Sequence, residues 1–153
     1  MGKTQSKKRV GILGGGQLAR MLALAAHNLG LQPWVLSSSS DDPAAQVTKW
    51  WLKGDPNKAK DLSRFLKNVD VVTVESEFLD AAVLEKVCRK SRVEIFPKAQ
   101  LLLLLQDRLY QKFLLRKSNL PTLPFIDVQH ISHLNFAIKL FGYPLVLKKR
   151  RFG

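Results

Sequence analysis

Short apolar runs along the chain alternate with longer segments in which apolar residues recur at helical spacing. Strands are predicted at the apolar runs over residues 10–13, 33–36, 50–53, 69–75 and 93–96. Helices are predicted between them, over residues 17–30, from Asp55-Pro56 onward and over residues 80–90. The run VDVVTVE at 69–75 is β-branched and mostly apolar, as in a buried parallel strand. This alternation predicts an α/β fold with a doubly wound parallel sheet over residues 8–97.

The pattern changes after Pro97. The predicted elements there are one or two helices over residues 98–118, a strand over 125–128, a helix over 132–140 and a strand over 143–149. They are typical of the beginning of a second domain, over residues 98–153, and residues 1–7 are interpreted as a basic tail. We expect the second part to be less ordered than the first or to present an exposed apolar surface.

Composition excludes several classes of protein. Hydrophobic residues make up 46% of the chain, too many for a disordered protein. The longest apolar run, residues 101–105, is far too short to span a membrane, and the N-terminus does not resemble a secretory signal. The single cysteine, Cys88, excludes an internal disulfide framework and fits a cytoplasmic location. We expect Cys88 to be an unreactive, buried thiol.

The net charge of +13 is concentrated at the two ends of the sequence. Eight cations lie there: Lys3, Lys7, Lys8, Arg9, Lys148, Lys149, Arg150 and Arg151. Charge alone favours a polyanionic partner. However, no RNA-binding signature with interleaved aromatic residues and no zinc-finger spacing is present. We therefore expect nucleic acid not to be the partner, and we interpret the two ends as a solvated tail and a phosphate-facing cluster.

The first candidate site is the glycine-rich turn between the first predicted strand and helix. The sequence GGGQLA at residues 14–19 fits the pattern G-x-G-x-x-A, in which glycines permit a sharp turn and helix-start amides face a phosphate. A dinucleotide site also needs a carboxylate at the end of the second strand, where this chain has Ser37. Asp41 and Asp42 come too late unless the loop folds back. A turn required only for strand–helix packing explains the glycines equally well.

Two carboxylates, Glu75 and Glu77, follow the most strand-like segment. Ligands of open α/β sheets gather at such strand ends, beside the first glycine loop. We expect only one of the two carboxylates to meet a ligand. Capping of the next helix, or plain solvent exposure, is the competing interpretation for each.

Two clusters of cations complete the candidates. Arg108, Lys112 and Arg116 recur along one face of a predicted helix, for which a solvated basic face is the ordinary interpretation. Near the end of the chain, Lys148 and Arg150 would point to one side of the predicted strand, and lysine suits a nucleotide phosphate.

Several segments taken in order resemble one family. They are VGILGGGQLARMLALAA, DDPAAQV, VDVVTVESE, QDRLYQKFLL, LPTLPF and GYPLVLKKRRFG. Together they resemble 5-(carboxyamino)imidazole ribonucleotide synthetase, an ATP-grasp ligase of purine biosynthesis. The resemblance runs from residue 10 to residue 153.

This resemblance implies a Rossmann-like pre-ATP-grasp domain followed by the start of an incomplete ATP-grasp domain. It implies a ligase that uses ATP and Mg²⁺ to activate bicarbonate and passes the carboxylate to aminoimidazole ribonucleotide. It also implies a homodimer and no membrane partner. Within this chain it assigns no catalytic residue and no metal ligand.

The resemblance also implies individual contacts. Matched by motif, Arg108 and Lys148 are similar to the family's first two ATP-contacting residues. The residues that fall where the substrate nucleotide approaches are Gly16, Gln17, Leu18 and Glu77.

The chain departs from the family pattern at several positions. The family usually has glycine at Ala19, phenylalanine at Ser76, asparagine at Phe78, an acidic residue at Ser37 and glycine at Phe152. Its phosphate loop and metal-binding carboxylates would follow residue 153. We therefore expect the front part of a longer ligase, inactive alone. The alternatives are a non-catalytic nucleotide-binding or dimerising module and, less favoured, a basic nucleic-acid-binding protein.

Overall fold

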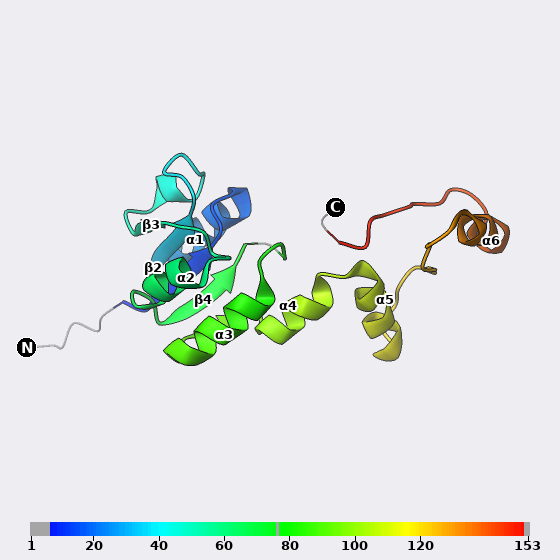
Figure 1. Cartoon of the computed structure of the whole chain (residues 1–153). Coiled ribbons are helices and arrows are strands. Elements are labelled where there is room, and N and C mark those ends of the chain that lie inside the picture. Colours follow the sequence, from blue (N-terminus) through cyan, green and yellow to red (C-terminus); the bar gives the residue numbers. More distant parts are fainter. Residues whose placement is uncertain (1–6, 76, 152–153) are drawn as a thin grey trace, which may run out of the picture. The chain divides into compact units, whose positions relative to one another are not determined.

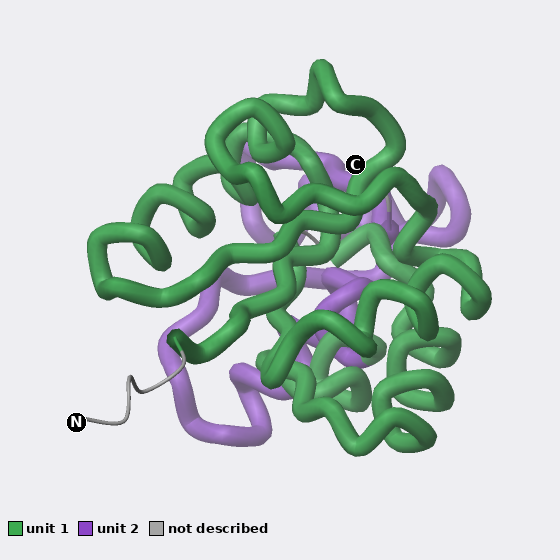
Figure 2. The backbone as a smooth tube through the Cα atoms, turned by 90° about the vertical axis from the view of Figure 1, so that its left-hand side faces the viewer, with its two compact units in different colours: residues 1–103 green, residues 104–153 purple. Residues whose placement is uncertain are grey.

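The computed structural model describes residues 7–75 and 77–151. Most of the predicted basic tail, residues 1–6, and the departures at Ser76 and Phe152 therefore lie outside the described residues. The chain divides into two compact units, Met1–Leu103 (unit 1) and Leu104–Gly153 (unit 2), which Figure 2 shows in different colours. The described sheet belongs entirely to unit 1.

A five-stranded parallel sheet forms the centre of unit 1 (Figure 1). Its strands are β1 (Arg9–Leu13), β2 (Gln32–Ser37), β3 (Trp51–Lys53), β4 (Val71–Val74) and β5 (Glu94–Phe96). Their order is β3-β2-β1-β4-β5, so the chain crosses from β3 at one edge to β4 on the other side of β1. The predicted doubly wound α/β sheet is confirmed, and its order reverses between β1 and β4.

Helical elements cover both faces of the sheet. They are α1 (Gln17–Asn28), the 3₁₀ turn η1 (Ala45–Val47), α2 (Ala59–Leu66) and α3 (Ala81–Ser91). Neighbouring residues of β1 serve opposite faces, as the pleat of a strand requires. Ile12 lies in a buried cluster with Ala23 of α1, whereas Leu13 lies in a larger cluster with Phe65 of α2. Unit 1 is therefore a three-layer α/β/α arrangement with a core on each face.

Unit 2 contains helices but no paired strand among its described residues. The helices are α4 (Ala99–Leu105), which crosses the unit boundary, α5 (Arg108–Lys117) and α6 (Ile131–Phe141). The strands predicted over residues 125–128 and 143–149 are wrong for this structure, because neither segment forms a strand. Both have strand-like composition, but a strand exists only when a second strand takes up its backbone hydrogen bonds.

Burial differs sharply between the two units. Two buried clusters hold unit 1 together, whereas Ala137 is the sole buried hydrophobic residue described in unit 2. The large exposed hydrophobic residues of unit 2 are Leu104, Tyr110, Phe113, Leu114, Leu120, Leu123, Ile131, Phe136, Leu140, Phe141, Tyr143, Val146 and Leu147. The apolar surface expected of the second part is confirmed.

Candidate functional site

The first candidate site lies where the sheet order reverses, at the carboxyl ends of β1 and β4. The glycine loop, residues 14–16, leaves β1 here, and Gly14 adopts a positive φ of 118°. The amide of Gly14 donates to the carbonyl of Leu36 at 3.0 Å, which fixes the loop beside the end of β2. Gly16 caps the start of α1. Open α/β sheets bind their ligands at such a reversal.

Glu75 lies directly against the glycine loop. Its Oε2 accepts a hydrogen bond from the backbone N–H of Gly16 at 2.8 Å. A Cβ atom added to Gly14 or Gly16 would overlap the Glu75 carboxyl group. Glycine is required at Gly14, whose φ is positive, whereas at Gly16 the Glu75 side chain would have to move. The loop therefore already faces an anion of its own chain. A phosphate at this amide would be repelled by Glu75, whereas a hydroxyl or amino donor would find an acceptor.

The loop after β2 folds back onto the glycine loop. Only such a fold allows Asp41 or Asp42 to reach the glycine loop. The amide of Ala44 donates to the carbonyl of Gly15 at 2.9 Å. A Cβ atom on Gly15 would lie 2.6 Å from Oδ2 of Asp42. At the end of β2, the Ser37 hydroxyl is buried and accepts from the indole N–H of Trp51 at 3.0 Å. Asp42, rather than the end of β2, thus supplies the carboxylate beside this loop.

The predicted nucleotide-contacting residues of unit 1 lie around this loop. Gly16 is half-buried at the helix start, and the side chains of Gln17 and Leu18 are exposed on the first turn of α1. Glu77 is exposed in the turn that follows β4. Sequence reasoning placed Glu75 at this edge but missed its bond to Gly16, because the two residues lie 59 positions apart.

The second candidate site lies in unit 2, around the start of α5, and it centres on Asp107. This carboxylate is buried and caps the helix by accepting from the backbone N–H groups of Leu109 at 3.0 Å and Tyr110 at 3.4 Å. Arg150 donates to it through Nε at 3.1 Å and Nη2 at 2.6 Å. The hydrogen bonds from Arg150 hold the pKa of Asp107 below its usual value. Sequence reasoning missed Asp107, although aspartate before a helix is a known capping signal.

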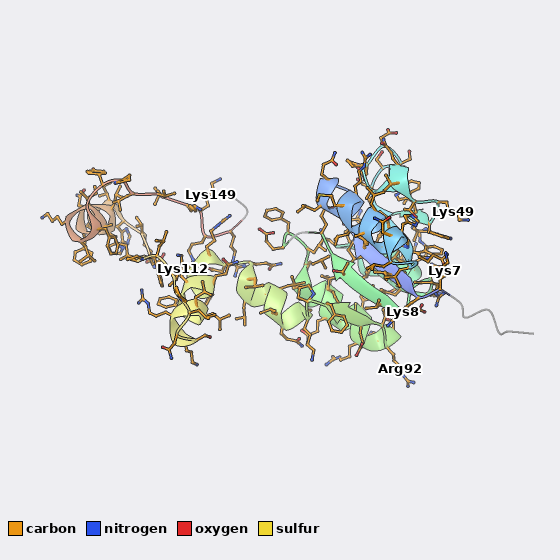
Figure 3. The ribbon with its side chains drawn as sticks, turned by 180° about the vertical axis from the view of Figure 1, so that it is seen from behind. Lys7, Lys8, Lys49, Arg92, Lys112 and Lys149 are labelled. Atoms are coloured by element: carbon orange, nitrogen blue, oxygen red, sulfur yellow. The ribbon has the colours of Figure 1, made fainter. Side chains whose placement is uncertain are left out.

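The two predicted ATP-contacting residues are brought to the same place. Arg108, the first residue of α5, donates through Nη1 to the carbonyl of Lys149 at 3.0 Å. Its backbone N–H donates to the carbonyl of Arg150 at 2.9 Å. Lys148 is exposed in the adjoining segment. Figure 3 labels Lys149 and Lys112 in this part of the chain. Arg108 is thus bonded to the backbone of the segment that carries Lys148.

The remaining cations of α5 do not form a merely solvated face. Lys112 donates through Nζ to the hydroxyl of Thr122 at 2.7 Å. The guanidinium of Arg116 lies 4.3 Å from the ring centroid of Phe125, which is cation–π geometry. The face is therefore not only solvated, although Arg116 remains exposed. Lys112 and Arg116 contact the segment that follows the helix, at Thr122 and Phe125.

The described residues offer no obvious metal or thiol chemistry. Nowhere in 7–75 or 77–151 do three His, Cys, Asp or Glu residues gather closely enough to hold a metal ion. The described residues therefore do not fit Mg²⁺. Burial raises the pKa of Cys88 to about 11, as expected for an unreactive thiol. No described helix has the length and apolarity to cross a membrane.

Comparison with known proteins gives a consistent set of similarities. The model of the ribonucleotide synthetase preATP-grasp domain matches residues 7–106. The bifunctional purine synthesis protein purC/E of Dictyostelium discoideum is 36% identical over 94% of this chain. N5-carboxyaminoimidazole ribonucleotide synthase of Staphylococcus aureus (strain COL) is 35% identical over 94% of this chain. The chain spans 14% and 38%, respectively, of the lengths of these relatives.

Solved structures agree with the sequence matches. The S. aureus N5-carboxyaminoimidazole synthetase complexed with ADP is 34% identical, with a TM-score of 0.81 over 95% of this chain and 39% of that chain. The Aspergillus clavatus N5-carboxyaminoimidazole synthase, in complex with ADP and 5-aminoimidazole ribonucleotide, is 33% identical. Its TM-score is 0.75, over 90% of this chain and 37% of that chain.

Proposed function

Since this chain belongs to the ribonucleotide synthetase pre-ATP-grasp domain family, we propose that it serves as the front part of an ATP-dependent ligase of purine biosynthesis. The ligase carboxylates aminoimidazole ribonucleotide with bicarbonate and consumes ATP. The observation that carries the proposal is the likeness to the S. aureus synthetase complexed with ADP, which extends over 95% of this chain. The A. clavatus structure, with ADP and 5-aminoimidazole ribonucleotide, supports aminoimidazole ribonucleotide as a substrate and ADP as the product formed from ATP.

Arg108 and Lys148 are the ATP contacts in this proposal. Guanidinium and ammonium groups bind phosphate oxygens through charge-assisted hydrogen bonds. The bond from Arg108 to the carbonyl of Lys149 and the exposure of Lys148 support a shared role. Arg150 is not assigned to ATP, because its guanidinium is engaged by Asp107.

The substrate nucleotide is proposed to approach the glycine loop of unit 1, at Gly16, Gln17, Leu18 and Glu77. The Glu75 carboxylate against this loop favours an uncharged part of the nucleotide, its hydroxyl or amino groups, over its phosphate. We also propose that the whole ligase is a cytoplasmic homodimer and that it uses Mg²⁺. No ligand for that ion is assigned to the described residues.

The test is a fusion protein in which this chain replaces the matched part of the S. aureus synthase and is joined to the rest of that enzyme. The fusion is expected to release ADP when ATP, bicarbonate and aminoimidazole ribonucleotide are supplied together. The chain by itself is expected to show no turnover, because it spans 38% of that relative. Turnover by the purified chain alone would contradict this part of the proposal.

Variants of the fusion test the two ATP contacts. Arg108→Ala and Lys148→Ala are each expected to raise the KM for ATP about tenfold or more, since each removes a charge-assisted phosphate contact. Lys117→Ala removes an exposed cation at the far end of α5 and serves as the matched control. An unchanged KM in both variants would remove Arg108 and Lys148 from the proposed site.

A further inference from the structure

Unit 2 has no hydrophobic core of its own. Its described part buries one hydrophobic side chain, Ala137, and leaves most of its large apolar residues exposed. The most exposed are Val146 at 79% and Leu123 and Tyr143 at 78% of their free surface. Leu147, beside Val146, is 70% exposed. An accumulation of exposed apolar side chains of this kind is typical of a surface against which another polypeptide packs.

Two segments of unit 2, one half-buried and one mostly exposed, have strand-like composition but join no sheet. Residues 125–128 and 143–149 have the apolar composition of strands, yet every paired strand of the described chain belongs to β1–β5. An extended segment without a partner pairs readily with the open edge of another sheet, and its alternate side chains then fill apolar pockets. The surface therefore calls for a partner that offers both an open sheet edge and an apolar face.

The relatives indicate which polypeptide meets this description. The fold of this chain matches the S. aureus synthetase at a TM-score of 0.81, but it covers 39% of that chain. In the relative, the matched part is continuous with a remainder longer than itself. We infer that residues 120–128 and 143–149 of this chain form a docking surface for the remainder of a carboxyaminoimidazole ribonucleotide synthetase, and that they bind it even when it is supplied as a separate polypeptide. This inference rests on the proposed function, but its test measures binding and not turnover.

Charge disfavours a second copy of this chain as the occupant. Unit 2 carries the closing cations Lys148, Lys149 and Arg151, and its carboxylates Asp107 and Asp127 both pair with Arg150. Docking this surface against an identical one would bring like charges together in an apolar contact, which costs free energy.

The experiment co-expresses the full chain, carrying an affinity tag, with the untagged remainder of the S. aureus synthase, and measures the ratio of the two polypeptides recovered on the resin. Near-equal recovery is expected from the wild-type chain. Leu147→Asp is expected to lower the recovered remainder about tenfold, because it places a charge in the apolar contact. Leu29→Asp is the matched control, since Leu29 is 75% exposed but lies in unit 1, and it is expected to leave recovery unchanged.

Hydrogen exchange on the recovered complex provides the second readout. The amides of residues 145–149 are expected to gain protection at least about tenfold, because they become paired with a strand of the remainder. Absence of the remainder from the wild-type resin, or equal recovery with Leu147→Asp, would overturn the inference. A dimer of the chain alone that Leu147→Asp abolishes would overturn it too, by making a second copy the occupant. Binding without turnover in the fusion would instead refute the proposed function and leave this inference standing.

Discussion

At the scale of single residues, the contact between Glu75 and the glycine loop is expected to decide which ligands the first site accepts. Glycine loops at the start of a helix commonly bind phosphate through their backbone amides. In this chain the Gly16 amide donates to Glu75 at 2.8 Å, and a Cβ at Gly14 or Gly16 would collide with the same carboxyl group. The Gly16 amide is therefore engaged by a carboxylate of its own chain, which repels a second anion at this position.

Removal of this carboxylate is expected to open the loop to phosphate. In Glu75→Ala the Gly16 amide loses its acceptor, so unit 1 is expected to lose about 1–2 kcal/mol of unfolding free energy. Inorganic phosphate is expected to shift the NMR signal of the Gly16 amide in Glu75→Ala but not in the wild type. Glu94→Ala removes the same charge at the start of β5 and serves as the control. A phosphate-dependent shift of Gly16 in the wild type would contradict this reading of the loop.

The thiol of Cys88 provides a second test at this scale. Burial raises its pKa from an ordinary 9.0 to about 11, so the neutral form persists to higher pH. At pH 9, about one hundredth of the native thiol is ionised, compared with about half in the unfolded chain. Alkylation by iodoacetamide at pH 9 is therefore expected to be slow in buffer and fast in denaturant. Equal rates in the two conditions would show that Cys88 is exposed.

At the scale of elements, Asp107 connects the start of α5 to the end of the described chain. It caps the helix through Leu109 and Tyr110 and pairs with Arg150, 43 residues away. The pKa of Asp107 lies below its usual value, chiefly through the hydrogen bonds from Arg150. The stabilisation is thus fully present above the ordinary carboxyl pKa and is lost as the pH falls through the lowered value.

Two substitutions separate the two roles of Asp107. Asp107→Asn keeps a capping oxygen but loses the charge that pairs with Arg150, whereas Asp107→Ala loses both. Both variants are expected to speed tryptic cleavage after Lys148 and Lys149, because the pair holds this segment against α5. Only Asp107→Ala is expected to fray the helix start, at a cost of about 1 kcal/mol, seen as faster exchange of the Leu109 amide. Unchanged cleavage in both would show that the pair does not hold the segment.

The elements also show how far local sequence determines this fold. The five strands of unit 1 and helices α1, α2 and α3 follow from apolar runs, helical spacing and stops such as Gly30, whose φ of 73° suits glycine. The segments at 125–128 and 143–149 have the same local composition and form no strand. Local pattern identifies residues able to form a strand, but pairing is a non-local event that requires a partner.

The candidate sites show the same difference between local patterns, which the sequence reveals, and contacts between distant residues, which it does not. The glycine loop and Arg108 stand out because their motifs are contiguous in sequence. The contacts that define both sites join distant residues, Gly16 with Glu75 and Asp107 with Arg150, and no local pattern reveals them. The sequence predicts that Asp42 reaches the glycine loop only if the loop after β2 folds back. The structure shows this fold, which brings Asp42 next to Gly15.

At the scale of the whole molecule, the two units differ in how they are stabilised. Unit 1 buries clusters on both faces of its sheet, with Phe65 and Leu84 fully enclosed. Unit 2 leaves most of its large apolar side chains exposed and concentrates cations around α5 and residues 148–151. This contrast is expected if unit 1 folds on its own contacts and unit 2 completes its packing against further polypeptide, as the coverage of 38% of the S. aureus relative suggests.

The central claim is that this chain can replace the corresponding part of a carboxyaminoimidazole ribonucleotide synthetase. The most direct measurement is the rate of ADP release by the fusion with the S. aureus remainder, with and without aminoimidazole ribonucleotide. The account predicts release that depends on that nucleotide and on bicarbonate, at a rate within about a hundredfold of the S. aureus enzyme, since a mispositioned site can cost that much. A correctly folded fusion that releases ADP no faster with the nucleotide than without it would contradict the account.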